Sequence, residues 1–170
     1  MSDSRATEAN LTNFEVKALR DHLDRQAIDD VINGYYHALD TRDFSLLKNV
    51  FAEDAMFVAH TVDGSSYPFH GFDAVLTGLR GVEAFNISHH GVRNRSIAID
   101  GDNAQGNIYA LDALLFDRDG KPCLRFHGLR YVDTYARTAA GWRIASRHLY
   151  ELWEYEVDDL KVLPEFPIPR

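Results

Sequence analysis

The chain has a single cysteine and no long apolar segment. Cys123 alone can build neither a disulfide framework nor a multi-cysteine zinc site, so a reducing cytoplasm is the expected compartment. No window approaches about 18 uninterrupted apolar residues, and the first ten residues lack the apolar stretch of an export signal. We therefore expect a protein that neither spans a membrane nor is exported by such a signal.

Positive charge is also scarce. The 170 residues carry 18 Lys and Arg against 26 Asp and Glu, which gives a formal net charge of −8 and a pI near 5.4. Binding to a nucleic-acid backbone needs clustered Lys and Arg that displace counterions, and the sequence has no such cluster. We expect neither a nucleic-acid partner nor a membrane partner.

The motifs that hold metals, phosphates or cofactors are missing as well. None of the eight histidines belongs to a His-x-x-x-His or Glu-x-x-His pair that would bind a metal from one helix. There is no phosphate loop, no G-x-G-x-x-G fingerprint and no serine in a nucleophile elbow. The sequence predicts no metal and no cofactor, so any chemistry must come from side chains.

Helical periodicity dominates the N-terminal half. Apolar residues from Val16 to Leu39 recur at three- and four-residue steps, which predicts one long helix, or two joined near Leu23, with one buried stripe. Asp43 is placed to cap a second, short helix. The segment "FDAVLTGLRGVEAF" (72–85) predicts a third helix.

The second half has the pattern of an antiparallel meander. Turn signals at "DGDN", "DRDGK" and "TAAG" separate four stretches rich in Ile, Leu, Tyr and Val, and Gly101, Gly120 and Gly141 supply the positive φ angles of tight hairpins. A strand, "DAMFVAHTV", and a short extended piece, "SYPFHG", precede the meander. This order predicts an α+β domain with helices on one face of a curved antiparallel or mixed sheet.

We expect one folded domain with a tail at each end. Residues 1–16 are mostly polar and are expected to be a flexible N-terminal tail. Residues 17–157 form the expected domain. Residues 158–170 contain three prolines and are expected to form an extended C-terminal tail.

Four segments occur in the order typical of a known family. They are "AIDDVINGYYHALDTRDFSLLKNVFAEDAMF", "HHGVRN", "IDGDNAQG" and "YVDTYARTAAGWRIASR". Over residues 17–157 the chain resembles the SnoaL-like branch of the nuclear-transport-factor-2-like (NTF2-like) superfamily, and is most similar there to scytalone dehydratase, hexachlorocyclohexane dehydrochlorinase and bile-acid 7α-dehydratase. The resemblance implies a cone of three N-terminal helices on a strongly curved sheet, and cofactor-free lyase chemistry by an Asp–His pair in its mouth.

The resemblance places the aspartate at the end of the long helix, in a Y-x-x-x-x-D arrangement that gives Tyr35 and Asp40. A helix C-terminus repels a carboxylate by a few tenths to about 1 kcal/mol, because the macrodipole is negative there. Asp40 is therefore either a carboxylate compensated by a proton-holding histidine or a solvated residue at a helix end. Tyr35 either donates a hydrogen bond to a substrate carbonyl or belongs to the core. Tyr36 and His37 are expected in packing or at the surface.

In the related lyases the catalytic histidine precedes an asparagine by four positions, as His90 precedes Asn94. Neighbouring residues of a strand point to opposite faces, so only one of His89 and His90 can reach the interior. His90 is the candidate base, and His89 is a candidate for substrate contact.

Arg147 follows Trp142 by five residues, where the dehydrochlorinase places an arginine that supports its leaving group. Strand alternation puts Arg147 on the face opposite to Trp142 and Ile144 unless a bulge intervenes. Without a bulge, His148 would face inward and contact substrate instead.

A set of apolar residues is expected to line a pocket for a ring-containing substrate. Most of them are alternatively simple core residues. They are Phe57, Phe69, Phe85, Leu114, Phe126, Leu129, Tyr131 and Trp153.

These features predict a cofactor-independent lyase (dehydratase or dehydrohalogenase) or isomerase that acts on a small, apolar, cyclic substrate. His90 removes a proton, Asp40 orients and charges the pair, and Tyr35 and Arg147 stabilise the developing oxyanion or leaving group. The rival is a non-catalytic cone that carries a ligand or partners a larger subunit. The distance between Asp40 and His90 discriminates between the enzyme and the non-catalytic cone.

The apolar last strand, "HLYELWEYE", is compatible with a homo-oligomer, either a dimer or a trimer.

Overall fold

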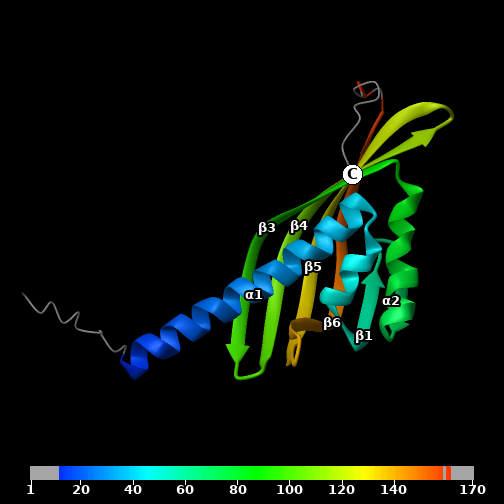
Figure 1. Ribbon diagram of the computed structural model, residues 1–170. Coiled ribbons are helices and arrows are strands. Elements are labelled where there is room, and N and C mark those ends of the chain that lie inside the picture. Colours follow the sequence, from blue (N-terminus) through cyan, green and yellow to red (C-terminus); the bar gives the residue numbers. More distant parts are fainter. Residues whose placement is uncertain (1–11, 159, 162–170) are drawn as a thin grey trace, which may run out of the picture.

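Helices lie on one face of a strongly curved sheet, which gives the expected α+β cone (Figure 1). The structure, a computed structural model, describes residues 12–158, 160 and 161, and most of both expected tails lies outside this range. The helices are α1 (Asn13–Thr41), the 3₁₀ helix η1 (Phe44–Asn49), α2 (Phe72–Leu79) and the 3₁₀ helix η2 (Arg80–Ala84). The strands are β1 (Phe51–His60), β2 (Ser66–His70), β3 (Ile87–Asp100), β4 (Asn103–Arg118), β5 (Lys121–Thr138) and β6 (Gly141–Val157).

The long helix α1 begins at Asn13, three residues before the expected start. Thr12 caps it: its Oγ1 accepts a hydrogen bond from the Glu15 N–H at 3.2 Å, and the Glu15 carboxylate accepts one from the Thr12 N–H at 2.8 Å. This capping box satisfies two backbone donors that a helix start leaves unpaired. Residues 13–16 are therefore helical, although the sequence places them in the tail.

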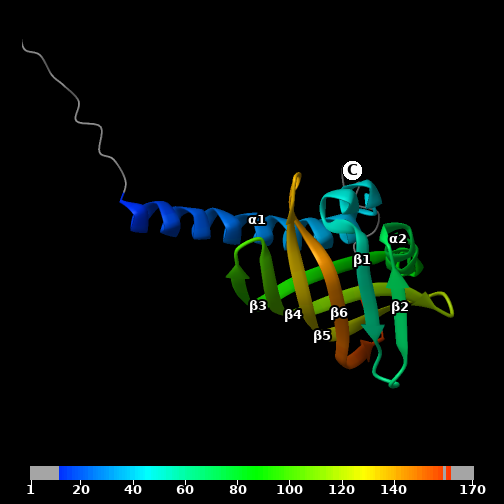
Figure 2. The ribbon, with the colours of Figure 1, turned by 90° about the horizontal axis from the view of Figure 1, so that it is seen from below.

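The first turns of α1 project beyond the sheet (Figures 1 and 2). Val16, Leu19 and Leu23 are 43%, 49% and 58% exposed. The expectation of one buried stripe along the whole helix is wrong here, because the strands lie under the second half of α1 only. From Ile28 to Leu39 the stripe is buried in the core.

The short helices follow the sequence signals closely. The Asp43 side chain accepts a hydrogen bond from the Ser45 N–H at 3.2 Å and caps η1, as expected. The helix predicted over 72–85 is α2, which continues as η2 after Leu79. Gly78 lets α2 pack directly on β2, because a Cβ at this position would lie 2.7 Å from the Phe69 ring.

The sheet has the strand order β2-β1-β6-β5-β4-β3. Strands β3 to β6 form the predicted antiparallel meander, and Gly101, Gly120 and Gly141 have φ angles of 59°, 75° and 101° at its hairpins. Strand β1 pairs antiparallel with β2 but parallel with β6, which makes the sheet mixed. The core lies between this sheet and α1. Within the described part of the chain, no helix combines the length and the apolar character needed to cross a membrane.

Two register shifts between β5 and β6 decide which side chains face the helices. At the first, Tyr135 pairs with Ile144 and Thr134 with Ser146, so one residue of β6 is skipped. At the second, Gly128 pairs with Trp153, and a Cβ on Gly128 would lie 2.1 Å from the Trp153 ring. Trp153 is 49% exposed on the outer face, so the expectation that it lines the interior is wrong.

Candidate functional site

Asp40 lies in the last turn of α1 and accepts three hydrogen bonds from β3. Its Oδ1 is 3.0 Å from the Ser88 hydroxyl and 2.5 Å from Nδ1 of His90, and its Oδ2 accepts from the His90 backbone N–H at 3.1 Å. Burial alone would raise the pKa of Asp40, but the His90 and Ser88 hydrogen bonds outweigh it and lower this pKa. The carboxylate is therefore held ionised at the negative end of the helix.

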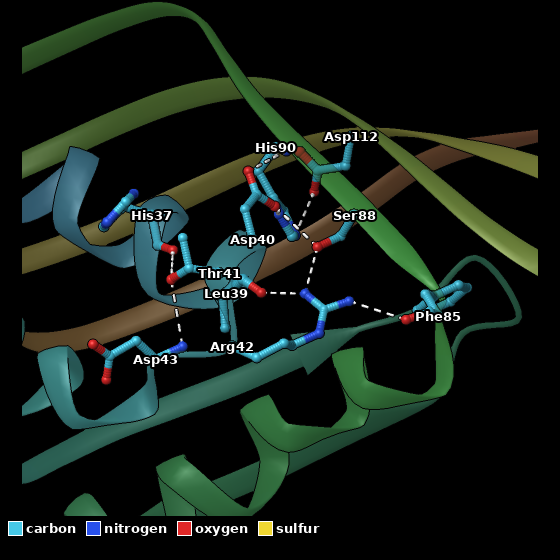
Figure 3. A network of polar contacts seen from close by, with 10 residues as sticks. All are labelled: His37, Leu39, Asp40, Thr41, Arg42, Asp43, Phe85, Ser88, His90 and Asp112. Atoms are coloured by element: carbon cyan, nitrogen blue, oxygen red, sulfur yellow. Dashed lines mark hydrogen bonds and ion pairs between the residues drawn. The ribbon is translucent and has the colours of Figure 1, made fainter. Parts of the chain in front are cut away.

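Arg42 neutralises the same helix end. It is the C-cap residue of α1, in the left-handed region at φ 61°, and its guanidinium donates to the Leu39 carbonyl. The same group donates to the Ser88 hydroxyl at 2.6 Å and to the Phe85 carbonyl at 3.1 Å (Figure 3). A cation among the last carbonyls of a helix opposes the macrodipole. Arg42 was not anticipated from the sequence, although a basic residue two positions after a helix-terminal carboxylate is a signal for this role.

His90 enters from β3 with its side chain only 7% exposed, whereas His89 is exposed on the opposite face. The imidazole lies between two carboxylates: Asp40 at Nδ1, and Asp112 at Nε2 with its Oδ2 3.7 Å away (Figure 3). Asp40 is acceptor-only when ionised, so the short contact assigns a proton to Nδ1. The proximity of Asp40 and His90 is thus a property of the structure, and their catalytic role stays a prediction.

Asp112 was not anticipated from the sequence. It pairs with His90 across β3 and β4 and is 2% exposed. Burial raises its pKa to about 6, while the neighbouring His90 and the backbone N–H of Gly91 act in the opposite direction. The available signal was a single carboxylate within the apolar run "ALDALLF", where a buried acid is rare unless it is paired.

Tyr36, rather than Tyr35, is the tyrosine next to the imidazole. Its ring centroid is 5.8 Å from that of His90, because residue 36 lies one helical turn before Asp40. The Tyr36 hydroxyl is buried without a hydrogen-bond partner among the described residues. Tyr35 is 1% exposed in the core, where burial raises its pKa to about 12. Tyr36 is itself 5% exposed and belongs to the core cluster, so the expectation that it is a packing residue is confirmed.

Arg147 faces inward because β6 skips one residue before it. Both side chains of the Arg147–Asp133 pair are 0% exposed, with contacts of 2.9 Å and 2.7 Å, and the guanidinium lies between two tyrosine rings at 4.2 Å and 4.6 Å. These rings belong to Tyr35 and Tyr131. The bulge that the sequence left open is thus present.

His148 lies on the outer face as a consequence of the same bulge. Its Nδ1 is 3.2 Å from Nε2 of His60, and the two rings stack with their centroids 5.5 Å apart. The Tyr150 ring stacks on His60 at 4.4 Å and its centroid is 6.3 Å from that of His148. The expectation that His148 contacts an interior substrate is corrected by this placement.

Most of the apolar residues assigned to a pocket are buried or half-buried, among them Leu114 at 5% exposure and Phe126, which is half-buried. Phe57, Leu129 and Tyr131 are buried to 4%, 3% and 1% exposure and belong to the core cluster. Phe69 and Phe85 are half-buried. A hollow of about 470 Å³ lies elsewhere, on the far side of α1 against the β5–β6 turn, and neither Asp40 nor His90 lines it. The substrate-binding role of these apolar residues stays a prediction.

Two buried residues beside His90 carry unpaired polar atoms. Five buried side-chain atoms in the described residues lack a hydrogen-bond partner, and they include the Tyr36 hydroxyl and Asp112 Oδ1, both next to the imidazole. Since native proteins satisfy most buried polar groups, these two atoms indicate a place for a polar ligand atom or a water. Across residues 12–158, 160 and 161 no group of three or more His, Cys, Asp or Glu is arranged to hold a metal ion.

The fold is that of a SnoaL-like member of the NTF2-like superfamily. The SnoaL-like domain family matches residues 20–148, and the chain belongs to this family. An uncharacterized protein of Mycobacterium tuberculosis, Rv2910c, is 32% identical over 124 residues, which cover 73% of this chain and 82% of that protein.

Solved structures share the fold at lower identity. The hexachlorocyclohexane dehydrochlorinase LinA-type3 of Novosphingobium barchaimii has a TM-score of 0.72 and 16% identity, covering 87% of this chain and 99% of that one. The Kfla4162 protein of Kribbella flavida has a TM-score of 0.72 and 22% identity, covering 79% and 95%. At these identities the likeness concerns the fold.

Proposed function

We propose that the protein is a cofactor-independent lyase or isomerase in which His90 is the base and Asp40 its orienting partner. The observation that carries this proposal is the 2.5 Å contact between His90 Nδ1 and Asp40 Oδ1 at a buried imidazole. A non-catalytic module has no need for this pairing. The dehydrochlorinase of the same fold supports a lyase by analogy of architecture only.

In this proposal Nε2 of His90 carries out the proton transfer. Asp40 keeps the proton on Nδ1, which leaves the lone pair of Nε2 on the side of Asp112, whose Oδ2 is 3.7 Å away. When Nε2 takes a proton from a carbon next to a carbonyl group, the imidazole becomes positive. The ionised Asp40 stabilises that charge, because its lowered pKa keeps it from being protonated itself.

Tyr36 is the donor best placed for the developing oxyanion. Its hydroxyl is buried, unpaired among the described residues and on a ring adjacent to the imidazole. Such a donor gains a partner only when a substrate oxygen arrives. Arg147 is fully enclosed and held by Asp133, so it supports the tyrosine rings rather than touching a leaving group.

The surroundings favour a small, apolar, cyclic carbonyl compound as substrate, because aromatic and aliphatic side chains surround the few polar groups. We further propose a homo-oligomer formed through the outer face of the sheet. Tyr150, Trp153 and Tyr155 expose 36%, 49% and 63% of their surface there, and such exposed aromatic side chains are typical of subunit interfaces.

The test is deuterium incorporation at the α-carbon of cyclohexanone in D₂O, followed by NMR, because it reports C–H cleavage before any leaving group departs. Asp40→Asn and His90→Gln should each lower the exchange rate by about 10²–10⁴-fold. Two matched controls should behave as wild type: His89→Gln, on the outer face, and Asp30→Asn, exposed on α1. Wild-type exchange that persists in both site variants would refute the assignment.

A further inference from the structure

A pair of histidines lies on the outer face of the sheet, opposite to the face that carries the dyad. His60 is the last residue of β1, and His148 follows Arg147 in β6. In the parallel β1–β6 register His148 pairs with Val58, two positions before His60. His148 reaches this face because β6 skips one residue before Arg147. The bulge that sends Arg147 inward therefore also brings the two imidazoles together.

Two ring nitrogens of this pair face each other. His60 Nε2 and His148 Nδ1 are 3.2 Å apart, and the ring planes differ by 12°. A hydrogen bond between them requires a proton on one nitrogen and a lone pair on the other. Two nitrogens bound to one tetrahedral ion at about 2.05 Å each lie about 3.3 Å apart. The spacing in the structure is therefore close to that of a metal chelate.

The neighbours of His60 hold its ring in this orientation. Its other nitrogen, Nδ1, is 2.8 Å from the Ser66 hydroxyl, and the Tyr150 ring stacks on the imidazole with the planes 8° apart. A histidine that binds a metal almost always has its second ring nitrogen hydrogen-bonded in this way, because that bond fixes the tautomer and directs the remaining lone pair. Both histidines are half-buried, so solvent reaches the pair while little ordering remains for an ion to impose.

We propose that His60 and His148 form a binding site for a divalent transition-metal ion, held by His60 Nε2 and His148 Nδ1. Imidazole ligands suit Cu²⁺, Ni²⁺ and Zn²⁺, whereas Mg²⁺ and Ca²⁺ prefer oxygen ligands. Within the described chain no third His, Cys, Asp or Glu joins the pair, so water completes the coordination. The site is independent of the proposed function, because the dyad lies on the other face of the sheet.

The protons of a neutral pair balance when the ion binds. With the His60 proton on Nδ1, toward Ser66, its Nε2 accepts the Nδ1–H of His148. On binding, the His148 proton moves to Nε2 of its own ring, through solvent, and His60 keeps its tautomer. Both facing lone pairs then bind the ion. In acid both facing nitrogens carry a proton, so the affinity for the ion falls as the pH falls.

The test is a titration of the full-length protein with Cu²⁺ near pH 7, followed by electron paramagnetic resonance. Among these ions Cu²⁺ binds most tightly, and its spectrum counts the nitrogens bound to each ion. The wild type should bind one ion per chain through two imidazole nitrogens. Ser66→Ala should weaken binding about 10-fold, since it removes the partner of His60 Nδ1. His60→Gln and His148→Gln should each weaken it further and leave a single imidazole nitrogen.

Two further histidines locate the ion. The matched control is His89→Gln, on the outer face of β3 at the far edge of the sheet, and it should bind Cu²⁺ as the wild type does. Loss of binding in His90→Gln would place the ion at the dyad and overturn the proposal. Circular dichroism spectra equal to that of the wild type would show that each variant is folded.

A second measurement identifies the binding atoms without a substitution in the observed protein. In protein labelled with ¹⁵N histidine, Zn²⁺ should shift the signals of His60 Nε2 and His148 Nδ1 and leave those of His89 in place. The single variants assign these signals. The proposal is overturned if neither histidine responds to Zn²⁺, or if His60→Gln and His148→Gln bind Cu²⁺ as tightly as the wild type.

Discussion

Replacing Arg147 by methionine tests how the interior behind the dyad is held together. The Arg147–Asp133 pair is completely enclosed and makes two contacts of 2.9 Å and 2.7 Å. Asp133 Oδ2 also accepts a hydrogen bond from the Tyr135 hydroxyl at 2.7 Å. Methionine fills the volume of the arginine stem between the tyrosine rings, but it leaves the carboxylate without its cation.

The loss of stability in Arg147→Met comes from the Asp133 carboxylate that remains buried without a cation. Breaking an enclosed ion pair by removing one partner destabilises a protein by about 3–5 kcal/mol, mainly because an uncompensated charge stays behind. The net contribution of the intact pair is much smaller, because both ions were desolvated to form it. Adding Asp133→Asn to Arg147→Met removes the stranded charge and keeps an acceptor for Tyr135. The double variant should therefore recover most of the loss.

The assay is urea denaturation at pH 7 of the wild type, both single variants and the double variant. The matched control is Arg125→Met, whose partner Glu156 and whose own side chain are 27% and 30% exposed. This half-exposed pair should contribute less than about 1 kcal/mol. The reasoning is refuted if Arg147→Met costs no more than Arg125→Met, or if the double variant loses the sum of the single losses.

Two further predictions concern stability. The pKa of Asp112 rises from 3.8 to about 6 on folding, so the stability that its neutral form contributes is lost as the pH rises from about 4 to above 6. At about 1.36 kcal/mol per unit, Asp112→Asn should be more stable than wild type by up to about 3 kcal/mol at pH 7 and equal to it near pH 4, measured by urea titrations across this range. A constant difference at every pH would contradict the burial argument. Thr12→Ala removes half of the capping box with Glu15 and should cost about 1 kcal/mol with a loss of helical circular dichroism; an unchanged spectrum and midpoint would show that the first turn is not held by its cap.

Local sequence signals were sufficient where the structure depends on local geometry. The hairpins at Gly101, Gly120 and Gly141 follow from turn chemistry, and the pairing of Asp40 with His90 follows from the resemblance together with strand alternation. The order of helices and strands was predicted for the same reason. For the hairpins the relevant information lies within a few residues, whereas the pairing of Asp40 with His90, 50 positions apart, required the resemblance.

The errors arose where distant segments decide the outcome. Strand alternation alone cannot locate the skipped residue before Arg147, which sends Arg147 inward and His148 outward. That shift lies where β6 pairs with β1 on one side and β5 on the other, so it depends on residues nearly a hundred positions away. Likewise, the periodicity of Leu19 and Leu23 predicts a buried face, but whether a sheet lies beneath it is set by the length of the strands.

The site depends on the β3–β4 register as much as on the helix end. Asp40 comes from α1, while His90 and Asp112 come from adjacent strands and lie directly opposite each other. A slip of one residue in β3 would turn the imidazole to the outer face and bring His89 or Gly91 opposite Asp112.

Twelve residue pairs hold β3 to β4, interrupted by one shift between Val92 and Arg95. Because that shift follows His90 so closely, the register around the dyad is fixed by the short segment from Ile87 to Val92, where Ser88 and His90 both bind Asp40. The carboxylate at the helix end therefore fixes the strand register that places the base in the interior.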